Sequence, residues 1–141
     1  MCIKKTALRL VRKYKTRCPF QISEHKNIPV IKEPLGSIYG YTHTYKRIPI
    51  IHINSDLDRP MQRFVCAHEL GHIILHPTVN TPFMKAQTLF SIDKFEKEAN
   101  IFAVELLMPD DAVREHESVF KAAIACCVPT EVAILKQINE L

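Results

Sequence analysis

The spacing of apolar and polar positions along the chain predicts a mixed α+β protein. Helical spacing of apolar residues appears in three main segments. These are residues 4–15, about 59–76 and 92–107. Runs rich in strand-forming residues lie between the first two. These are residues 28–31, 37–45 and 48–54. The pattern therefore predicts a small, roughly three-stranded sheet packed on helices, with a tight turn at Lys46-Arg47 joining two strands as a hairpin.

Shorter elements complete the expected layout. Cys18-Pro19-Phe20 ends the first helix, and a short helix follows at residues 21–25. Residues 77–91, with two prolines, are expected to form a loop, after which Ser91 caps the helix that begins at Ile92. The C-terminal part is expected to be helical. Its predicted helices are residues 110–117, 119–127 and 131–140.

The helix expected at residues 59–76 carries chemistry as well as packing. It is apolar on nearly all sides, which is typical of a buried helix. Yet it contains His68, Glu69 and His72, and burying polar groups without partners is costly. A metal ion bound by these side chains would remove that cost. Gly71 is unfavourable inside a helix, so a neighbouring element is expected to pack closely there.

The spacing of these residues favours zinc hydrolysis. Histidines four positions apart share one face of a helix, so His68 and His72 can both reach one tetrahedral ion. Glu69, directly after the first histidine, is placed to accept a proton from a water on that ion. We therefore predict that His68 and His72 bind zinc and that Glu69 is the catalytic base.

A third protein ligand is needed, and the helix at residues 92–107 supplies the candidates. A metzincin would place a third histidine at position 78, but this residue is Thr78. His76 lies ~12 Å along the helix from His68, too far to share one ion with it. We favour Glu96, which shares a face with small residues and with Asn100, a possible partner for a ligand histidine. Glu98, on a bulkier face, is the alternative.

Composition narrows the class of protein further. A chain of 141 residues with 47% hydrophobic residues predicts one soluble globular domain spanning residues 1–141. It has no apolar run long enough for a membrane span and no secretory signal, and five cysteines without a C-x-x-C pair indicate reduced thiols in a cytoplasm. A net charge of +4 does not indicate direct nucleic-acid binding, and the basic side of the first helix is interpreted as a solvated face.

At these motifs the chain resembles the ImmA/IrrE metallopeptidase family. The matching pieces are His68 to His76 and Glu96 to Pro109, with weaker agreement in residues 34–40 and 48–54. The resemblance implies a zincin-like fold of the gluzincin type, Zn²⁺ as cofactor, a phage or mobile-element context, and cleavage of a helix-turn-helix repressor. It also implies His68, His72 and Glu96 as ligands and Glu69 as base, in agreement with the packing argument for Glu96.

Two questions stay open at this stage. An oxyanion-stabilising residue is needed, and the candidates on the sheet are Tyr39, Tyr41, His43 and His52. An edge strand within residues 37–45 is expected to pair with an extended substrate. The alternative function is a non-catalytic module that binds a repressor or acts as a toxin–antitoxin partner, with a structural metal. An open fourth metal position would favour catalysis, and four closed ligands would favour the structural role.

Overall fold

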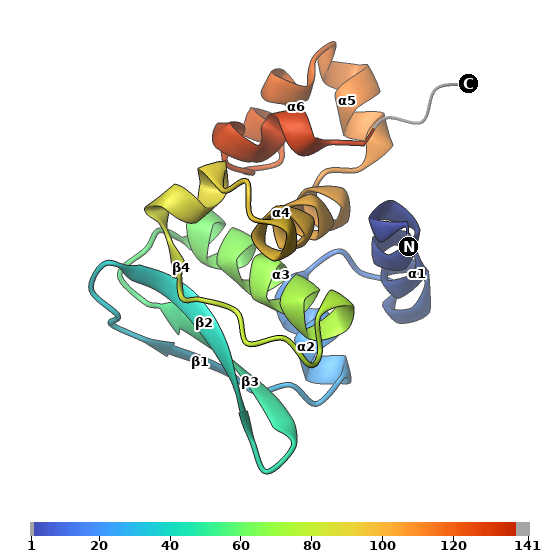
Figure 1. Cartoon of the computed structure of the whole chain (residues 1–141). Helices are drawn as coiled ribbons and strands as arrows, with labels where there is room; N and C mark the ends of the chain where they lie inside the picture. The colour runs from blue at the N-terminus through green and yellow to red at the C-terminus, as the bar shows by residue number, and fades with distance from the viewer. Residues whose placement is uncertain (1, 138–141) are drawn as a thin grey trace.

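The computed structural model describes residues 2–137 and has an α+β architecture (Figure 1). The α-helices are α1 (Ile3–Tyr14), α2 (Pro19–His25), α3 (Arg59–Leu75), α4 (Lys94–Leu107), α5 (Asp110–His116) and α6 (Val119–Ala125). The strands are β1 (Val30–Glu33), β2 (Ile38–Tyr45), β3 (Ile48–Asn54) and β4 (Met84–Lys85). A 3₁₀ helix, η1 (Ala86–Phe90), precedes α4, and a second one, η2 (Thr130–Leu135), follows α6.

The sheet is mixed and has four strands in the order β1-β3-β2-β4. β1 runs parallel to β3, whereas β2 is antiparallel to both β3 and β4. The hairpin between β2 and β3 turns at Lys46 and Arg47, both with positive φ, as a two-residue turn between twisted strands requires. The expected hairpin and its turn are therefore confirmed.

The helix α3 lies between the sheet and α4 (Figure 1). Two glycines allow this close layering. A Cβ on Gly40 of β2 would lie 2.5 Å from a methyl carbon of Val65 on α3, and a Cβ on Gly71 of α3 would lie 2.9 Å from the ring of Phe102 on α4. The prediction of a close neighbour at Gly71 is thus confirmed, and that neighbour is Phe102.

The core is built from the facing sides of these three layers. Ile51 and Ile53 of β3, Phe64 and Leu70 of α3, and Phe102 of α4 are fully buried. The apolar character of α3 on all sides follows from its position, since the sheet covers one side and α4 the other. Within residues 2–137, no helix is long and apolar enough to cross a membrane.

Three expectations need correction. The sheet has four strands rather than three, because residues 77–91 contain β4 and η1 instead of an irregular loop throughout. The cap of α4 is Asp93 rather than Ser91, since the Asp93 carboxylate accepts hydrogen bonds from the backbone N–H groups of Phe95 and Glu96. The last predicted helix is a 3₁₀ helix at Thr130–Leu135, and positions 138–140 of that prediction lie outside the described residues.

Candidate metal centre

The helix α3 places His68, Glu69 and His72 in the interior. Asp58 caps its start by accepting a hydrogen bond from the Met61 N–H, and Pro60 lies in the first turn, where no N–H is needed. The two histidines and the glutamate are each 3% exposed or less. Their burial leaves the two imidazoles one turn apart on the side of α3 that faces α4.

The helix α4 brings Glu96 to the same point. Glu96 is 3% exposed, and its Oε1 lies 3.0 Å from His72 Nε2 and 3.5 Å from His68 Nε2. The two Nε2 atoms are 3.1 Å apart. Two ligands bound at 2.0–2.1 Å to a tetrahedral ion lie about 3.3 Å from each other. The three donor atoms therefore already have the mutual spacing of a tetrahedral metal site.

The orientation of His68 is fixed by Asn100 on α4. Asn100 Oδ1 lies 2.8 Å from His68 Nδ1, and Asn100 Nδ2 donates to the backbone carbonyl of Thr88. Because the amide nitrogen is used by Thr88, the amide oxygen faces His68 and accepts the Nδ1 proton. This arrangement leaves the lone pair of His68 Nε2 directed at Glu96 and His72, as metal-binding histidines require. The expected partnership between Asn100 and a histidine is present.

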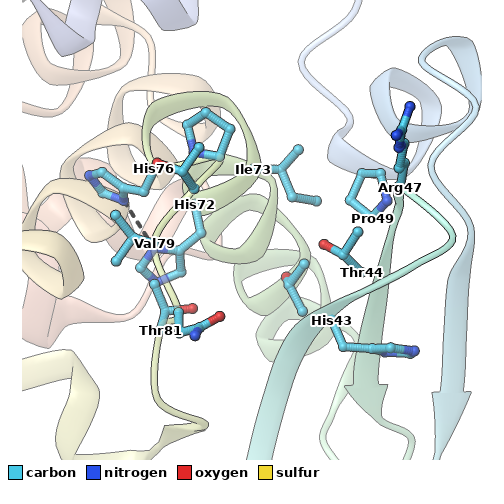
Figure 2. A pocket seen from close by; sticks show the side chains of 13 residues that line it. His43, Thr44, Arg47, Pro49, His72, Ile73, His76, Val79 and Thr81 are labelled. Atoms are coloured by element: carbon cyan, nitrogen blue, oxygen red, sulfur yellow. Dashed lines mark hydrogen bonds between the residues drawn. The ribbon is translucent and has the colours of Figure 1, made fainter.

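His72 is oriented by a second chain of hydrogen bonds, which the sequence did not reveal. His72 Nδ1 lies 3.1 Å from His76 Nδ1, drawn as the dashed line in Figure 2, and His76 Nε2 lies 2.9 Å from Glu98 Oε1. If His76 donates to the Glu98 carboxylate, its Nδ1 accepts the proton of His72 and frees His72 Nε2. Glu98, the alternative ligand considered above, therefore contacts His76 rather than the His68–His72 pair.

Glu69 points to the other side of the histidines, toward the sheet. Its Oε1 accepts a hydrogen bond of 2.9 Å from Thr42 on β2, and its Oε2 lies 4.0 Å from His68 Nε2. Burial raises the pKa of Glu69 to about 7, although the charge of His72 and the hydrogen bond from Thr42 oppose the rise. A carboxyl group with such a pKa can both accept and release a proton near neutral pH.

The site has the chemistry of a cation site. Among the described residues, Glu69 Oε2 and Glu96 Oε2 are buried without a hydrogen bond of good geometry, although Glu96 Oε2 lies 3.0 Å from His72 Nε2. Burial would raise the pKa of Glu96, but hydrogen bonds and charge from His68 and His72 outweigh burial and lower it to about 2. A buried, ionised carboxylate beside two imidazoles fits a metal ion, and two histidines with one glutamate form a donor set used by catalytic zinc.

Comparison with known families agrees with this geometry. Residues 23–130 match the family described as the IrrE N-terminal-like domain, a peptidase family. The chain belongs to this metallopeptidase family. The matched residues include β1 to β4, α3 and α4, and therefore the whole His68–His72–Glu96 site.

Two relatives in this family show a consistent context. The chain is 47% identical to immunity region protein 2 of Bacillus phage phi105 over 144 aligned positions, which cover 99% of this chain and 91% of the relative. It is 33% identical to the metallopeptidase ImmA of Bacillus subtilis strain 168 over 115 positions, covering 80% of this chain and 67% of that protein. The family assignment and the phage-associated relative were both expected from the sequence.

An open cleft of about 490 Å³ lies beside the site (Figure 2). One wall is the end of β2 and the hairpin turn, including Thr42 and Thr44, and the other is formed by His72, His76 and residues 77–81. Among the described residues, β4 pairs with β2 only at Ile38 and Gly40, so the edge of β2 beyond Gly40 is not covered by β4. The expected loop at residues 77–91 thus contributes to the cleft wall through its first part.

The four candidates for the oxyanion-stabilising residue are Tyr39, Tyr41, His43 and His52, and the last three contact one another on β2 and β3. Within the described chain, His43 is the one that lines the cleft, and Figure 2 shows its ring turned away from His72. Tyr41 stacks on His52 with ring centroids 4.4 Å apart, and His43 Nδ1 lies 2.8 Å from His52 Nε2. Because side chains alternate along a strand, Thr42 faces Glu69 while Tyr41 and His43 face the opposite side of the sheet.

Proposed function

We propose that the protein is a zinc-dependent metalloendopeptidase of the gluzincin type. The observation that carries this proposal is the spacing of the three donor atoms, 3.0–3.5 Å from one another, beside a buried glutamate with an elevated pKa. The residues that would hold the ion are His68, His72 and Glu96. In the described chain this group has three donors, which leaves a fourth position open for water or substrate and favours a catalytic over a structural metal.

Bound zinc would polarise the scissile carbonyl and lower the pKa of water toward ~7. The chain's own contribution centres on Glu69, which would accept the proton of the attacking water and deliver it to the leaving amine. Thr42 holds the Glu69 carboxylate by its Oε1, so Oε2 is left to exchange the proton. Asn100 and His76 act as positioning residues, because they direct the Nε2 atoms of His68 and His72 toward the ion.

The cleft supports binding of an extended peptide. The edge of β2 beyond Gly40 offers backbone N–H and C=O groups along one wall of the cleft. A substrate segment that lies there as an added strand would form main-chain hydrogen bonds irrespective of its sequence. Such a segment would cross the cleft next to His72, which lines it.

We infer a helix-turn-helix repressor as the substrate. This inference rests on the family resemblance and on the relative in an immunity region of a phage, since repressors control phage immunity. The fold itself does not select this substrate. A non-catalytic repressor-binding role remains the alternative, and the same experiment separates the two.

The test uses the zinc-loaded protein and any helix-turn-helix repressor found to be encoded beside its gene, with and without a chelator. We expect wild-type protein to cleave the repressor and the chelator to stop cleavage. Glu69→Gln should keep zinc and lose about 10²–10⁴-fold in rate. Glu96→Gln should lose zinc, whereas the matched variant Glu98→Gln, whose amide oxygen can still accept a hydrogen bond from His76, should retain it.

Cleavage at the wild-type rate by Glu69→Gln would refute the assigned base. If the wild-type protein and every variant bind the repressor tightly but do not cleave it in the presence of zinc, the binding-module alternative is supported. Zinc lost from Glu98→Gln but kept by Glu96→Gln would reverse the assignment of the third ligand.

A further inference from the structure

Three large apolar side chains are exposed in the segment between α3 and α4. Phe83, Phe90 and Ile92 are 52%, 69% and 95% exposed, respectively. Phe83 precedes β4, Phe90 ends η1, and Ile92 lies directly before Asp93, the cap of α4. Phe83 packs on Tyr41 with ring centroids 4.8 Å apart, whereas Phe90 and Ile92 leave most of their side chains open to solvent.

These side chains line part of a second, open hollow that shares Glu96 with the candidate metal centre. The hollow has a volume of about 670 Å³, within the range of ligand pockets, and its remaining lining is mostly polar or charged, with Lys85 and Asp93 beside Glu96. The cleft described above is lined by His72, whose Nε2 lies 3.0 Å from Glu96 Oε1. Each hollow is therefore lined by one residue of the candidate metal centre, and the second hollow has the apolar rim.

The apolar rim is held in a fixed position relative to the metal site. The backbone carbonyl of Thr88 accepts hydrogen bonds from Asn100 Nδ2 and from the Ser91 N–H, and Ser91 Oγ accepts from the Asp93 N–H. Asn100 in turn contacts His68. The segment that carries Phe90 and Ile92 is thus tied to a metal-binding histidine through one side chain, which pre-organises the rim.

We propose that this cavity is a specificity subsite that takes a large apolar side chain of an extended peptide next to the metal centre, with Phe90 and Ile92 as its selecting residues. The proposal deepens the proposed function, because the peptide is the substrate of that same site. Its occupant is an aliphatic or aromatic side chain, since the exposed rim groups are themselves apolar and contact with them removes apolar surface from water.

The test separates binding from cleavage by using zinc-loaded Glu69→Gln protein. A random dodecapeptide display library is selected against this protein and against the same protein carrying Phe90→Ser and Ile92→Ser. Both positions are exposed, so these substitutions leave the core intact. Phe120→Ser with Ile124→Ser on α6 is the matched control, because these residues are 51% and 67% exposed but do not line the cavity.

We expect the selected peptides to share a Phe, Leu, Ile or Met at one position. The Phe90→Ser/Ile92→Ser protein should lose this preference and bind the selected peptides about tenfold more weakly or worse, whereas the control protein should keep both. The subsite is overturned if the preference is unchanged or if no peptides are enriched. It is also overturned if the zinc-loaded protein is a dimer that the Phe90→Ser/Ile92→Ser substitutions dissociate.

Cleavage is measured separately with wild-type protein on the selected peptides. Cleavage at a fixed distance from the apolar residue supports both proposals together. Selective binding by the rim without cleavage of any selected peptide would count against the hydrolase while supporting the subsite. If wild-type protein cleaves the peptides and the rim substitutions have no effect, the result supports the hydrolase and counts against the subsite.

Discussion

Replacing Glu69 by Gln should stabilise the metal-free protein at alkaline pH, although it abolishes the proposed catalytic base. Glu69 is 1% exposed, and burial raises its pKa from 4.5 to about 7. In the unfolded chain the group ionises at its ordinary pKa, so the folded protein binds a proton more tightly than the unfolded one. The unfolding free energy is therefore highest, as far as Glu69 is concerned, below pH 4.5, where its carboxyl group is protonated in both states. This contribution is lost as the pH rises through about 7.

The magnitude follows from the size of the shift. The rise of the Glu69 pKa from 4.5 to about 7 corresponds to about 3 kcal/mol between the limits of low and high pH. At pH 5 about 1 kcal/mol of this cost is already present, because the unfolded carboxyl group is largely ionised, and at pH 8 nearly all of it is present. Wild-type protein should thus lose about 2–3 kcal/mol of unfolding free energy between these pH values through Glu69 alone.

Glutamine has nearly the same shape and no charge, and its carbonyl oxygen can still accept the hydrogen bond from Thr42. Urea denaturation of chelator-treated wild-type and Glu69→Gln proteins at pH 5, 6, 7 and 8 gives the difference directly. The reasoning is refuted if the two unfolding free energies differ by the same amount at pH 5 and pH 8.

Saturating zinc provides the reverse experiment. A nearby divalent cation favours the ionised carboxylate, so zinc should reduce the alkaline advantage of the Gln variant. An advantage of the same size with and without zinc would mean that the ion lies too far from Glu69 to affect its ionisation.

Two further predictions concern the neighbours of the metal-binding residues. Asn100→Ala should lower zinc affinity by about 10–100-fold in competition with a chelating dye, because His68 Nδ1 loses its partner; unchanged affinity would refute the orienting role. Gly71→Ala should lower the unfolding free energy from urea denaturation by about 1–2 kcal/mol, since the ~1 kcal/mol gained in helix propensity is smaller than the cost of a Cβ placed 2.9 Å from the buried Phe102 ring; a stabilised variant would refute the close contact.

The local elements and the pairing of two helices could be inferred from the sequence because periodicity and the fixed spacing of His68 and His72 carry that information. Glu96 was favoured over Glu98 from its small neighbours on α4, and the structure brings Glu96 next to both histidines. Asn100 was found by the same argument. The proximity of Glu96 and Asn100 to the histidines could be inferred because positions on one face of a helix are determined by the sequence alone.

Contacts between distant segments were not accessible in this way. Thr42 meets Glu69 only because Gly40, two residues earlier, lets β2 approach α3, and nothing in the residues around Thr42 signals that contact. The link from Glu98 through His76 to His72 depends on the crossing of α3 and α4. β4 was missed because two residues are too few to show alternation, and their pairing with β2 is set by tertiary structure.

The family match covers residues 23–130, and residues before and after that region also hold α4 in place. Lys136 Nζ lies 2.7 Å from Glu105 Oε1 and 2.7 Å from Asp110 Oδ1, and Lys4 Nζ lies 2.8 Å from the same Asp110 oxygen. Lys4, Glu105 and Lys136 are each less than 10% exposed, and removing one member of such a buried group leaves the others without compensation. Glu105 lies on the helix that carries Glu96, so both ends of the chain hold the far end of that helix.

This arrangement matters for the metal site because the position of Glu96 depends on where α4 lies. The contact of Phe102 with Gly71 sets the distance between α3 and α4, Asp93 fixes the start of α4, and the ion pairs at Glu105 fix its end. A tetrahedral site tolerates little displacement of its ligands. Because α4 is fixed at three points, it keeps the Glu96 carboxylate in position. The precision of the centre is therefore a property of the packing of α4 rather than of the His68–His72 motif itself.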